Sequence, residues 1–341
     1  MGNITLLAVD IAKNVFQLQG RDKMGKVVLK KRLKRDQLMP FIANLPSCTI
    51  VMEACGSAHY WARKFKDSHH VKLISPQHVT PFRKGQKNDQ NDAEAIAEAA
   101  SRPTMVYVPL KSVECQDIQS IHRMRQLHIK QQTMLVNQIR GLLAEYGVVV
   151  PEGIHCLRKR LHPIIQDAGN ELTDFMRKEL ANLYESLLTF KKQIEHYDKQ
   201  IKQIALNSPV CRELMKLRGV GEKIATIMVA DLGDAKAYQK GRQYAANLGL
   251  VPKQHSSGDK QRLGNISKRG DSYVRQMLIH GARSALKHVK NKDDKLSIWL
   301  KRIQAKGGTN KAAVALANKN ARVIWAIVAN QSSFNQSLMI A

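Results

Sequence analysis

Four acidic side chains stand at places in the sequence where they could hold a divalent cation. Asp10 ends the apolar run ITLLAVD, and Glu53 lies at the end of TIVMEA. Asp89 and Asp92 lie three residues apart where a polar stretch passes into an alanine-rich helix, so they share one helix face. Carboxylate oxygens are the hard ligands that Mg²⁺ prefers, and the ion keeps other positions for water and phosphate. The pattern predicts a metal site that acts on phosphate.

Each of these acids also has a simpler interpretation. An aspartate at a helix start commonly caps the helix or faces its dipole, as Asp89 and Asp92 could. An acid at the end of a strand, such as Asp10 or Glu53, is common by itself. The metal-site prediction therefore depends on a fold that brings the four side chains to one edge.

The charge balance points to a polyanionic partner. The 341 residues include 55 Lys and Arg against 28 Asp and Glu, a net charge of +27. Such an excess is typical of proteins that displace counterions from nucleic-acid phosphates. We expect no membrane partner, because no apolar run approaches the ~20 residues that span a bilayer. The five cysteines form no CxxC pair and are expected to be reduced thiols of a cytoplasmic protein, without zinc or disulfides.

A serine-containing loop lies among cationic residues near the C-terminal end. The segment QHSSGDKQRLGNISKRG contains Ser256 and Ser257, followed by Gly258, which allows close backbone approach. A serine hydroxyl becomes a good nucleophile only beside a base, a metal or a strong positive field. From the residues alone, the loop either binds phosphate or carries a nucleophile. The cations that would contact nucleic-acid backbone here are Lys253, Lys260, Arg262, Lys268 and Arg269, with His255 beside them.

A second phosphate-binding candidate is the segment RGVGEK. A glycine-valine-glycine turn between two helical stretches resembles a helix-hairpin-helix motif, in which backbone N–H groups face phosphate. The predicted contacts are Arg218, Gly219, Gly221 and Lys223. An ordinary tight turn between helices is the alternative.

The order of the elements predicts how the acids are positioned. Residues 1–108 follow a β-β-β-α-β-α-β-α order, an α/β pattern with an antiparallel flank as in the ribonuclease-H-like architecture. In such a sheet the strands that end at Asp10 and Glu53 lie side by side. Residues 109–208 are a long helical connector or coiled coil, either a spacer or an oligomerisation arm. Residues 209–341 are expected to be mainly helical around the loop 253–270.

Several motifs together resemble one known family. LLAVDIAKNVFQLQG, VMEACGSAHYWAR, KNDQNDAEAIAEA, VNQIRGLLAEYG, LRGVGEKIATIMVADLGDA and GLVPKQHSSGDKQRLGNISKRGD are similar to segments of DEDD transposases of bacterial insertion sequences. More narrowly, they resemble the Piv-like family one-ten and its eleven-eleven subgroup, over essentially the whole chain and in the same order.

The resemblance implies a RuvC-like N-terminal domain whose Asp-Glu-Asp-Asp set corresponds to Asp10, Glu53, Asp89 and Asp92, with Mg²⁺ or Mn²⁺ as the cofactor. It also implies a C-terminal transposase domain whose nucleophilic serine precedes a glycine, which favours Ser257 over Ser256. Family members act in the bacterial cytoplasm as homodimers or homotetramers on donor and target DNA, and a noncoding bridge or seek RNA guides them.

Two other functions stay open at the level of sequence. A metal-dependent junction endonuclease would use water as the nucleophile, with the serine loop only binding phosphate. A non-enzymatic nucleic-acid-packaging protein would use its acids as helix caps.

Overall fold

The computed structural model describes residues 3–84, 89–258 and 260–335, with the side chains at 89 and 90 left out. The described chain divides into two compact units. One unit contains residues up to Val113 together with Leu232–Gln239, and the other contains Glu114–Asp231 and the residues from Lys240 onward. The predicted division at residues 108 and 208 stays a prediction.

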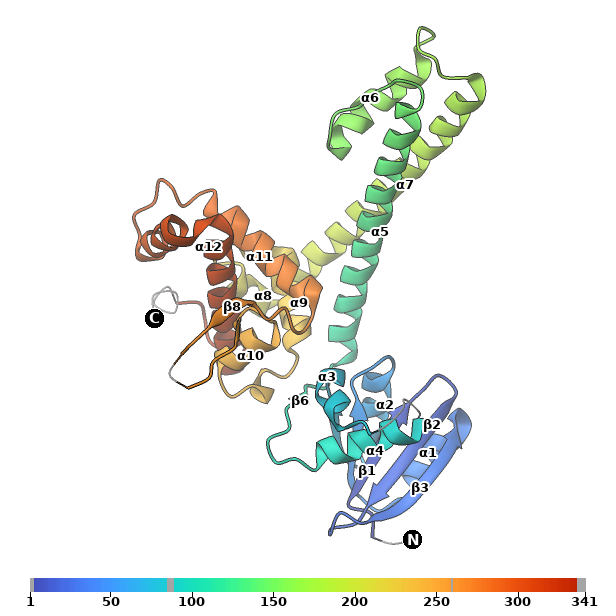
Figure 1. Ribbon diagram of the computed structural model, residues 1–341, viewed down its shortest axis with the longest axis vertical. Coiled ribbons are helices and arrows are strands. Elements are labelled where there is room, and N and C mark those ends of the chain that lie inside the picture. Colours follow the sequence, from blue (N-terminus) through green and yellow to red (C-terminus); the bar gives the residue numbers. More distant parts are fainter. Residues whose placement is uncertain (1–2, 85–88, 259, 336–341) are drawn as a thin grey trace. The chain divides into compact units, whose positions relative to one another are not determined.

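The first unit is built on a six-stranded mixed sheet (Figure 1). Its order is β3-β2-β1-β4-β5-β6, with β1 antiparallel to β2 and parallel to β4. The strands are β1 Leu6–Ile11, β2 Val15–Arg21, β3 Val27–Lys34, β4 Thr49–Glu53, β5 His70–Ile74 and β6 Tyr107–Val108. The α/β pattern with an antiparallel flank, and the pairing of the first and fourth strands, are confirmed.

The two faces of this sheet are covered by different helices. On one face, Leu7 and Val9 pack with Trp61 and other apolar side chains of two helices. On the other face, Ala8 and Val51 pack against a helix whose buried residues are mainly alanines. Because alanine side chains are short, this helix can lie close to the strands. The helices are α1 Arg35–Ala43, α2 Ala58–Phe65, α3 Pro76–Val79, the 3-10 turn η1 Thr80–Phe82, and the alanine-rich α4 Asp89–Ala100.

The second unit begins with an arm of long helices. Helix α5 spans Val113–Ala144 and α7 spans Asp174–Asn207, with the shorter α6, Ile154–Gln166, between them in the chain. Leucines, isoleucines and valines of the three helices form one apolar core. The expected pair of long helices is confirmed, whereas α6 was not predicted.

The rest of the second unit is mainly helical, as expected. It comprises α8 Pro209–Leu214, α9 Glu222–Leu232, α10 Gly241–Asn247, β7 Pro252–Gln254, β8 Leu263–Ile266, α11 Ser272–Leu286 and α12 Lys295–Asn330, while the 3-10 turn η2 Ala235–Ala237 lies in the first unit. Helix α12 contains a break at Gly308, where φ is 78°. It is the one described helix long and apolar enough to cross a membrane, but half of its most apolar stretch is buried in the fold, as expected for a core helix.

Candidate active site

Asp10 and Glu53 stand at neighbouring positions on adjacent parallel strands. The ladder between β1 and β4 pairs Ala8 with Val51 and ends at Val9 and Met52. Asp10 and Glu53 are the next residues of the two strands, so they share the face of Ala8 and Val51. Both are partly buried, and both make interactions within the chain. The fold therefore brings together the first two predicted carboxylates.

Helix α4 crosses the sheet on this same face. Its C-terminal half is anchored by Glu98, whose Oε2 lies 3.1 Å from Nη1 of Arg21 on β2. This contact lowers the pKa of the Glu98 carboxyl, and burial partly opposes the shift. Toward the N-terminal end, Ala93 lies against Gln17, the cross-strand partner of Asp10. The start of α4 is thus directed toward the edge where Asp10 and Glu53 lie.

Of the two aspartates of α4, the structure describes the side chain of Asp92 only. Asp92 is one residue before Ala93, and its Oδ1 lies 2.5 Å from Nε of Arg83. The contact is an ion pair without hydrogen-bond alignment. Asp89 begins the helix, but its side chain lies outside the described residues. Nothing in the spacing of the residues indicated the Arg83–Asp92 pair.

Cys55 experiences the charge of both strand-end carboxylates. Its Sγ lies 4.0 Å from the carbonyl oxygen of Ile11, at the end of β1. Burial raises the pKa of the Cys55 thiol, and the nearby Glu53 and Asp10 carboxylates raise it further. Negative charge is therefore concentrated where β1 and β4 end.

Asp10 and Glu53 suit one hard divalent cation. Mg²⁺ is commonly held by one or two carboxylates together with water and substrate phosphate. Within the described residues, no three His, Cys, Asp or Glu side chains gather closely enough to hold a metal ion. The ion pair with Arg83 involves Oδ1 of Asp92. Asp92 could therefore join the pair as a metal ligand only through its other oxygen or by leaving Arg83.

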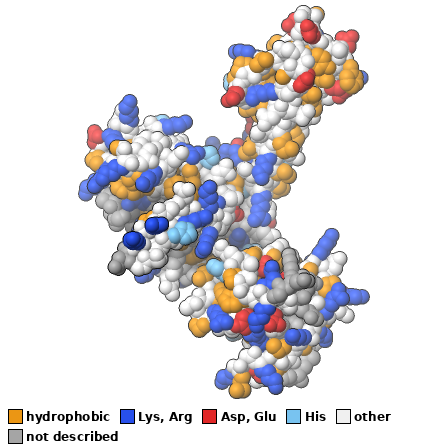
Figure 2. Space-filling view, viewed as in Figure 1, with side chains coloured by type: hydrophobic (Ala, Val, Ile, Leu, Met, Phe, Trp, Pro, Cys, Tyr) orange, Lys and Arg blue, Asp and Glu red, His pale blue; other side chains and the backbone are white. Residues whose placement is uncertain are grey.

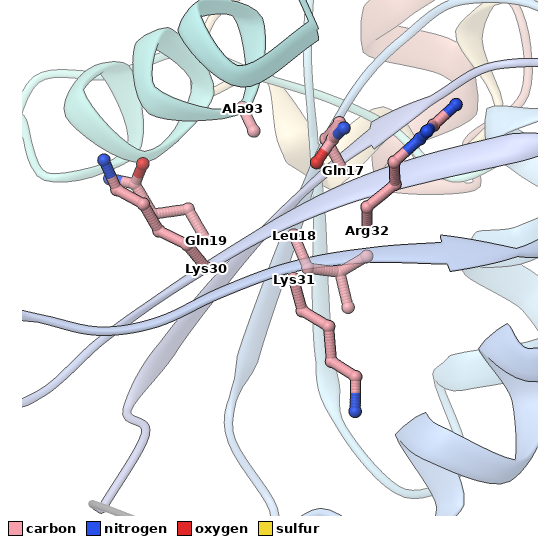
Figure 3. A pocket seen from close by; sticks show the side chains of 7 residues that line it. All are labelled: Gln17, Leu18, Gln19, Lys30, Lys31, Arg32 and Ala93. Atoms are coloured by element: carbon pink, nitrogen blue, oxygen red, sulfur yellow. The ribbon is translucent and has the colours of Figure 1, made fainter.

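Polar and basic side chains line a shallow pocket beside these carboxylates, on β2 and β3 under α4. Figure 3 shows Ala93 directed toward the strands near Gln17, and Lys31 directed to the opposite side. Arg32 pairs across the strands with Gln17, which in turn pairs with Asp10. A cation is thus placed in the same cross-strand row as the acids. The alternation in VFQLQG predicted a strand, but sequence reasoning did not predict this pocket, for which the alternating glutamines were the available signal.

The serine segment is a β-hairpin rather than the irregular loop expected from the sequence. Strand β7 pairs with β8, and Ser257 forms a bridge with Lys260 near the tip. The Ser256 hydroxyl accepts hydrogen bonds from Gln254 Nε2 at 3.0 Å and from the Arg262 backbone N–H at 3.3 Å. In the described part of the chain, the exposed Ser257 hydroxyl has no such bond. Ser256 therefore holds the hairpin together, and Ser257 stays available.

The base of the hairpin is tightly constructed. Gly249 and Gly270 both have positive φ, and a side chain at either would collide with the facing backbone. Arg275 of α11 is 9% exposed and donates to the carbonyl oxygens of Leu248 at 3.0 Å and Arg269 at 2.7 Å. These contacts join both ends of the segment to one helix, so the hairpin projects from a rigid support.

The predicted backbone-binding cations fall into two groups. Lys253, Lys260, Arg262, Lys268 and Arg269 are exposed on the hairpin segment. Arg218 and Lys223 instead form ion pairs within the chain, Arg218 with Asp294 at 2.9 Å and Lys223 with Asp198 at 2.9 Å. Figure 2 shows further Lys and Arg side chains over the visible face of each unit. Nucleic-acid contact by all these residues stays a prediction.

The glycines between α8 and α9 have a packing role. A Cβ at Gly219, whose φ is +79°, would lie 2.5 Å from the carbonyl oxygen of Gly281 on α11. A Cβ at Gly221 would meet nothing within 4 Å. Close approach of the turn to α11 therefore accounts for Gly219, and a helix-hairpin-helix function for Gly219 and Gly221 stays a prediction.

Two family models match the chain. Residues 7–148 match a transposase model for the DEDD domain of IS110 elements. Residues 211–296 match the model described as the transposase IS116/IS110/IS902 family. The two matches include the four predicted carboxylates and Ser257.

Full-length similarity to named transposases agrees with these matches. The chain is 46% identical to the transposase for insertion sequence element IS1111A of Coxiella burnetii, over 98% of this chain and 92% of that protein. It is 44% identical to a probable family 20 transposase of Pseudomonas aeruginosa, over 97% and 99% of the two chains. It is 36% identical to the transposase for insertion sequence element IS1328 of Yersinia enterocolitica, over 98% and 100%.

Proposed function

This chain belongs to the IS116/IS110/IS902 family of transposases and is therefore an enzyme that cleaves and rejoins DNA, and we propose that it is an RNA-guided recombinase with a serine nucleophile. It excises and inserts its own insertion sequence in the bacterial cytoplasm. The observation that carries the proposal is the placement of Asp10 and Glu53 at the ends of adjacent parallel strands, with α4 directed to the same edge.

The first step is attack of Ser257 Oγ on a DNA phosphodiester. An Oγ–P bond forms, the P–O3′ bond breaks, and the proton of the serine hydroxyl ends on the leaving 3′ oxygen. In the second step, the 3′-hydroxyl of the other DNA attacks this phosphorus, the P–Oγ bond breaks, and the proton of the 3′-hydroxyl ends on Ser257 Oγ. Each step exchanges one phosphate ester for another, so strands are exchanged without net hydrolysis.

The carboxylates would hold Mg²⁺ for this reaction. Asp10 and Glu53 supply two hard oxygen ligands, and Asp89 and Asp92 are the proposed remaining ones. The ion supplies stabilisation of negative charge that develops on the phosphate. The hairpin cations around Ser257 hold the DNA backbone and lower the cost of forming the serine alkoxide.

The choice of Ser257 over Ser256 is supported by their hydrogen bonds. Ser256 accepts two hydrogen bonds, one from Gln254 on its own side of the hairpin and one from the Arg262 backbone N–H across it. A nucleophile in that position would have to give up both contacts before attack. Ser257 is one residue closer to the tip, precedes Gly258 with its φ of +56°, and is exposed.

The decisive experiment is detection of a covalent protein–DNA adduct. Labelled DNA carrying an element end is incubated with Mg²⁺ and with the protein together with the RNA that copurifies with it, and the products are separated under denaturing conditions. We expect the parent chain and Ser256→Ala to form the adduct and Ser257→Ala to form none. Cutting that persists in Ser257→Ala without an adduct would instead establish the alternative, a metal-dependent endonuclease that uses water.

Guidance by RNA has its own test. Base pairing would carry the choice of sequence while the protein holds backbones through charge and shape. We expect one structured RNA, with loops complementary to both donor and target DNA, to copurify with the protein. Removing this RNA should abolish strand exchange, and adding it back should restore it; exchange by RNA-free protein would contradict guidance.

A further inference from the structure

A cationic groove between α10 and α12 has no part in the proposed reaction. Its lining residues are Lys240, Gly241, Arg242, Lys319, Arg322, Val323, Trp325 and Ala326. Four of these eight residues are cations, and the described lining includes no acidic side chain. The groove belongs entirely to the second unit.

The groove exists because the start of α10 lies directly on α12. A Cβ at Gly241 would lie 2.9 Å from the carbonyl oxygen of Arg322 and 3.1 Å from Cε3 of Trp325. Any larger residue at position 241 would push the two helices apart. The residues on either side of Gly241, Lys240 and Arg242, are exposed. Their positive charges therefore lie in the same groove as the charge of Arg322.

The charges in the groove crowd one another. Burial lowers the pKa of the Lys319 ammonium, and the neighbouring Arg322 lowers it further. The Lys319 Nζ also lies 5.1 Å from the ring centroid of Trp299. Like charges gathered without a lining carboxylate raise the local potential and favour an anionic ligand.

Trp325 distinguishes this groove from a simple phosphate site. A phosphate alone needs cations and N–H donors, whereas a nucleobase needs a flat aromatic surface beside them. The bases of a duplex are stacked on one another, and only an unpaired base can lie against an indole. We propose that the groove binds an unpaired segment of single-stranded nucleic acid, with its phosphates on Lys240, Arg242 and Arg322 and one base on Trp325.

The binding test uses the full chain with Ser257→Ala, so that no strand is cut. The probes are fluorescent 12-nucleotide single strands of RNA and of DNA, and a 12-base-pair duplex, each titrated at several salt concentrations. Lys240→Ala with Arg242→Ala should weaken single-strand binding and reduce the slope of log K against log salt by about 1.4, at about 0.7 per lost phosphate contact. The RNA and DNA arms show which single strand the groove prefers.

The matched control removes two charges from α12 outside the groove. Arg302 and Lys306 are exposed on that helix and form no ion pair or side-chain hydrogen bond with another described residue. Arg302→Ala with Lys306→Ala keeps the same net charge as the groove variant. It should leave single-strand affinity within about twofold of the parent and the salt slope almost unchanged.

Trp325 variants test the base contact. Trp325→Leu should bind single strands roughly tenfold more weakly and leave duplex binding unchanged, whereas Trp325→Phe should stay within about twofold of the parent. Melting curves of both variants show whether the second unit is still folded. Because Trp325→Leu changes the packing on Gly241, the variant Lys240→Ala with Arg242→Ala, which alters only exposed side chains, gives an independent measurement of binding in the groove.

Two results would overturn the proposal. If the groove variant and its control lose single-strand affinity to the same extent, only the total charge of the protein matters for binding. Equal losses of single-strand and duplex binding in Trp325→Leu would mean that no base is held. This proposal rests on the proposed function only in assuming a nucleic-acid partner. Formation of the Ser257-dependent adduct is measured separately, so a failure of the proposed function can be told apart from a failure of this proposal.

Discussion

His122 of α5 is a buried histidine that connects three helices of the second unit. Its Nδ1 lies 2.9 Å from the Tyr273 hydroxyl, and its Nε2 lies 3.0 Å from the Thr226 hydroxyl. Thr226 donates its own proton to the Glu222 carbonyl oxygen, so it accepts from Nε2–H, and Tyr273 donates to Nδ1. Burial lowers the pKa of His122 to about 4, and Arg125 and Lys223 contribute in the same direction against Asp198. The imidazole is therefore neutral in the folded chain.

We predict that His122 makes the second unit less stable in acid. The unfolded histidine, with a pKa of about 6.5, binds a proton below that pH, whereas the folded one does so only near pH 4. Folded-state stability is therefore lost as pH falls from about 6.5 to about 4. Between pH 7 and pH 5 this amounts to about 2 kcal/mol of unfolding free energy. Urea unfolding followed by circular dichroism at both pH values measures it.

A glutamine substitution isolates this contribution. His122→Gln retains a donor and an acceptor but cannot titrate, so its unfolding free energy should fall less between pH 7 and pH 5 than that of the parent. The exposed His155 gives the control, and His155→Gln should keep the parent's pH dependence. An identical pH dependence in the parent and His122→Gln would show that His122 is protonated normally in the folded state.

The hairpin β7–β8 depends on α11 for its position. Arg275 replaces hydrogen bonds that the Leu248 and Arg269 carbonyls would otherwise make with water. We predict that Arg275→Met lowers the unfolding free energy by about 2 kcal/mol, because one buried and one partly buried carbonyl oxygen lose a charged donor. It should also speed amide hydrogen exchange across residues 249–270 and slow adduct formation at Ser257.

Arg283 on the same helix gives the comparison. It is exposed and bonded to Asn310, so Arg283→Met should change stability by less than about 0.5 kcal/mol and leave exchange in the hairpin unaltered. If Arg275→Met lowers stability but exchange across 249–270 stays at the parent's rate, Arg275 supports α11 alone and does not position the hairpin.

Strand-level features of the first unit were predictable from the sequence. The apolar runs that form β1 and β4 lead into Asp10 and Glu53, and short turns separate β1, β2 and β3. The alternation of apolar and polar residues and the length of the apolar runs therefore identified the strands. The order of strands and helices along the chain identified which strands are neighbours. The hairpin was missed because β7 and β8 are only three and four residues long and almost fully exposed.

Tertiary partners were not predictable in the same way. Arg218 and Asp294 are 76 residues apart, and nothing in RGVGEK indicates that its arginine has a carboxylate partner. The same holds for Arg83 and Asp92, whose ion pair depends on how the segment before α4 is placed. Local spacing indicates which side chains could bind a phosphate or a metal, but not which of them already neutralise one another.

At the scale of the assembly, helix α5 carries a seam of apolar and polar side chains that its own chain leaves partly exposed. Val136, Ile139 and Leu143 face the core of the arm, whereas Leu127 and Met134 on the opposite side are 53% and 71% exposed. The seam follows the three- and four-residue spacing of a coiled coil. Its members are Met124, Leu127, Gln131, Met134, Gln138 and Gly141, and the last four line a groove with Phe190.

A second copy of this chain is the expected occupant of the seam, because a coiled-coil seam presents the same spacing to an identical helix. We predict that the parent is a dimer or tetramer and that Leu127→Glu with Met134→Glu yields monomers, measured by light scattering after size-exclusion chromatography. Phe175 and Val149 are as exposed but lie outside the seam, so Phe175→Glu with Val149→Glu should keep the parent's mass. Phe175→Glu with Val149→Glu should also keep the parent's melting temperature, and the monomeric seam variant should keep the parent's circular dichroism spectrum, since none of these side chains is buried. A seam variant that still assembles, or a parent that is monomeric at every concentration, would remove α5 as the contact between copies.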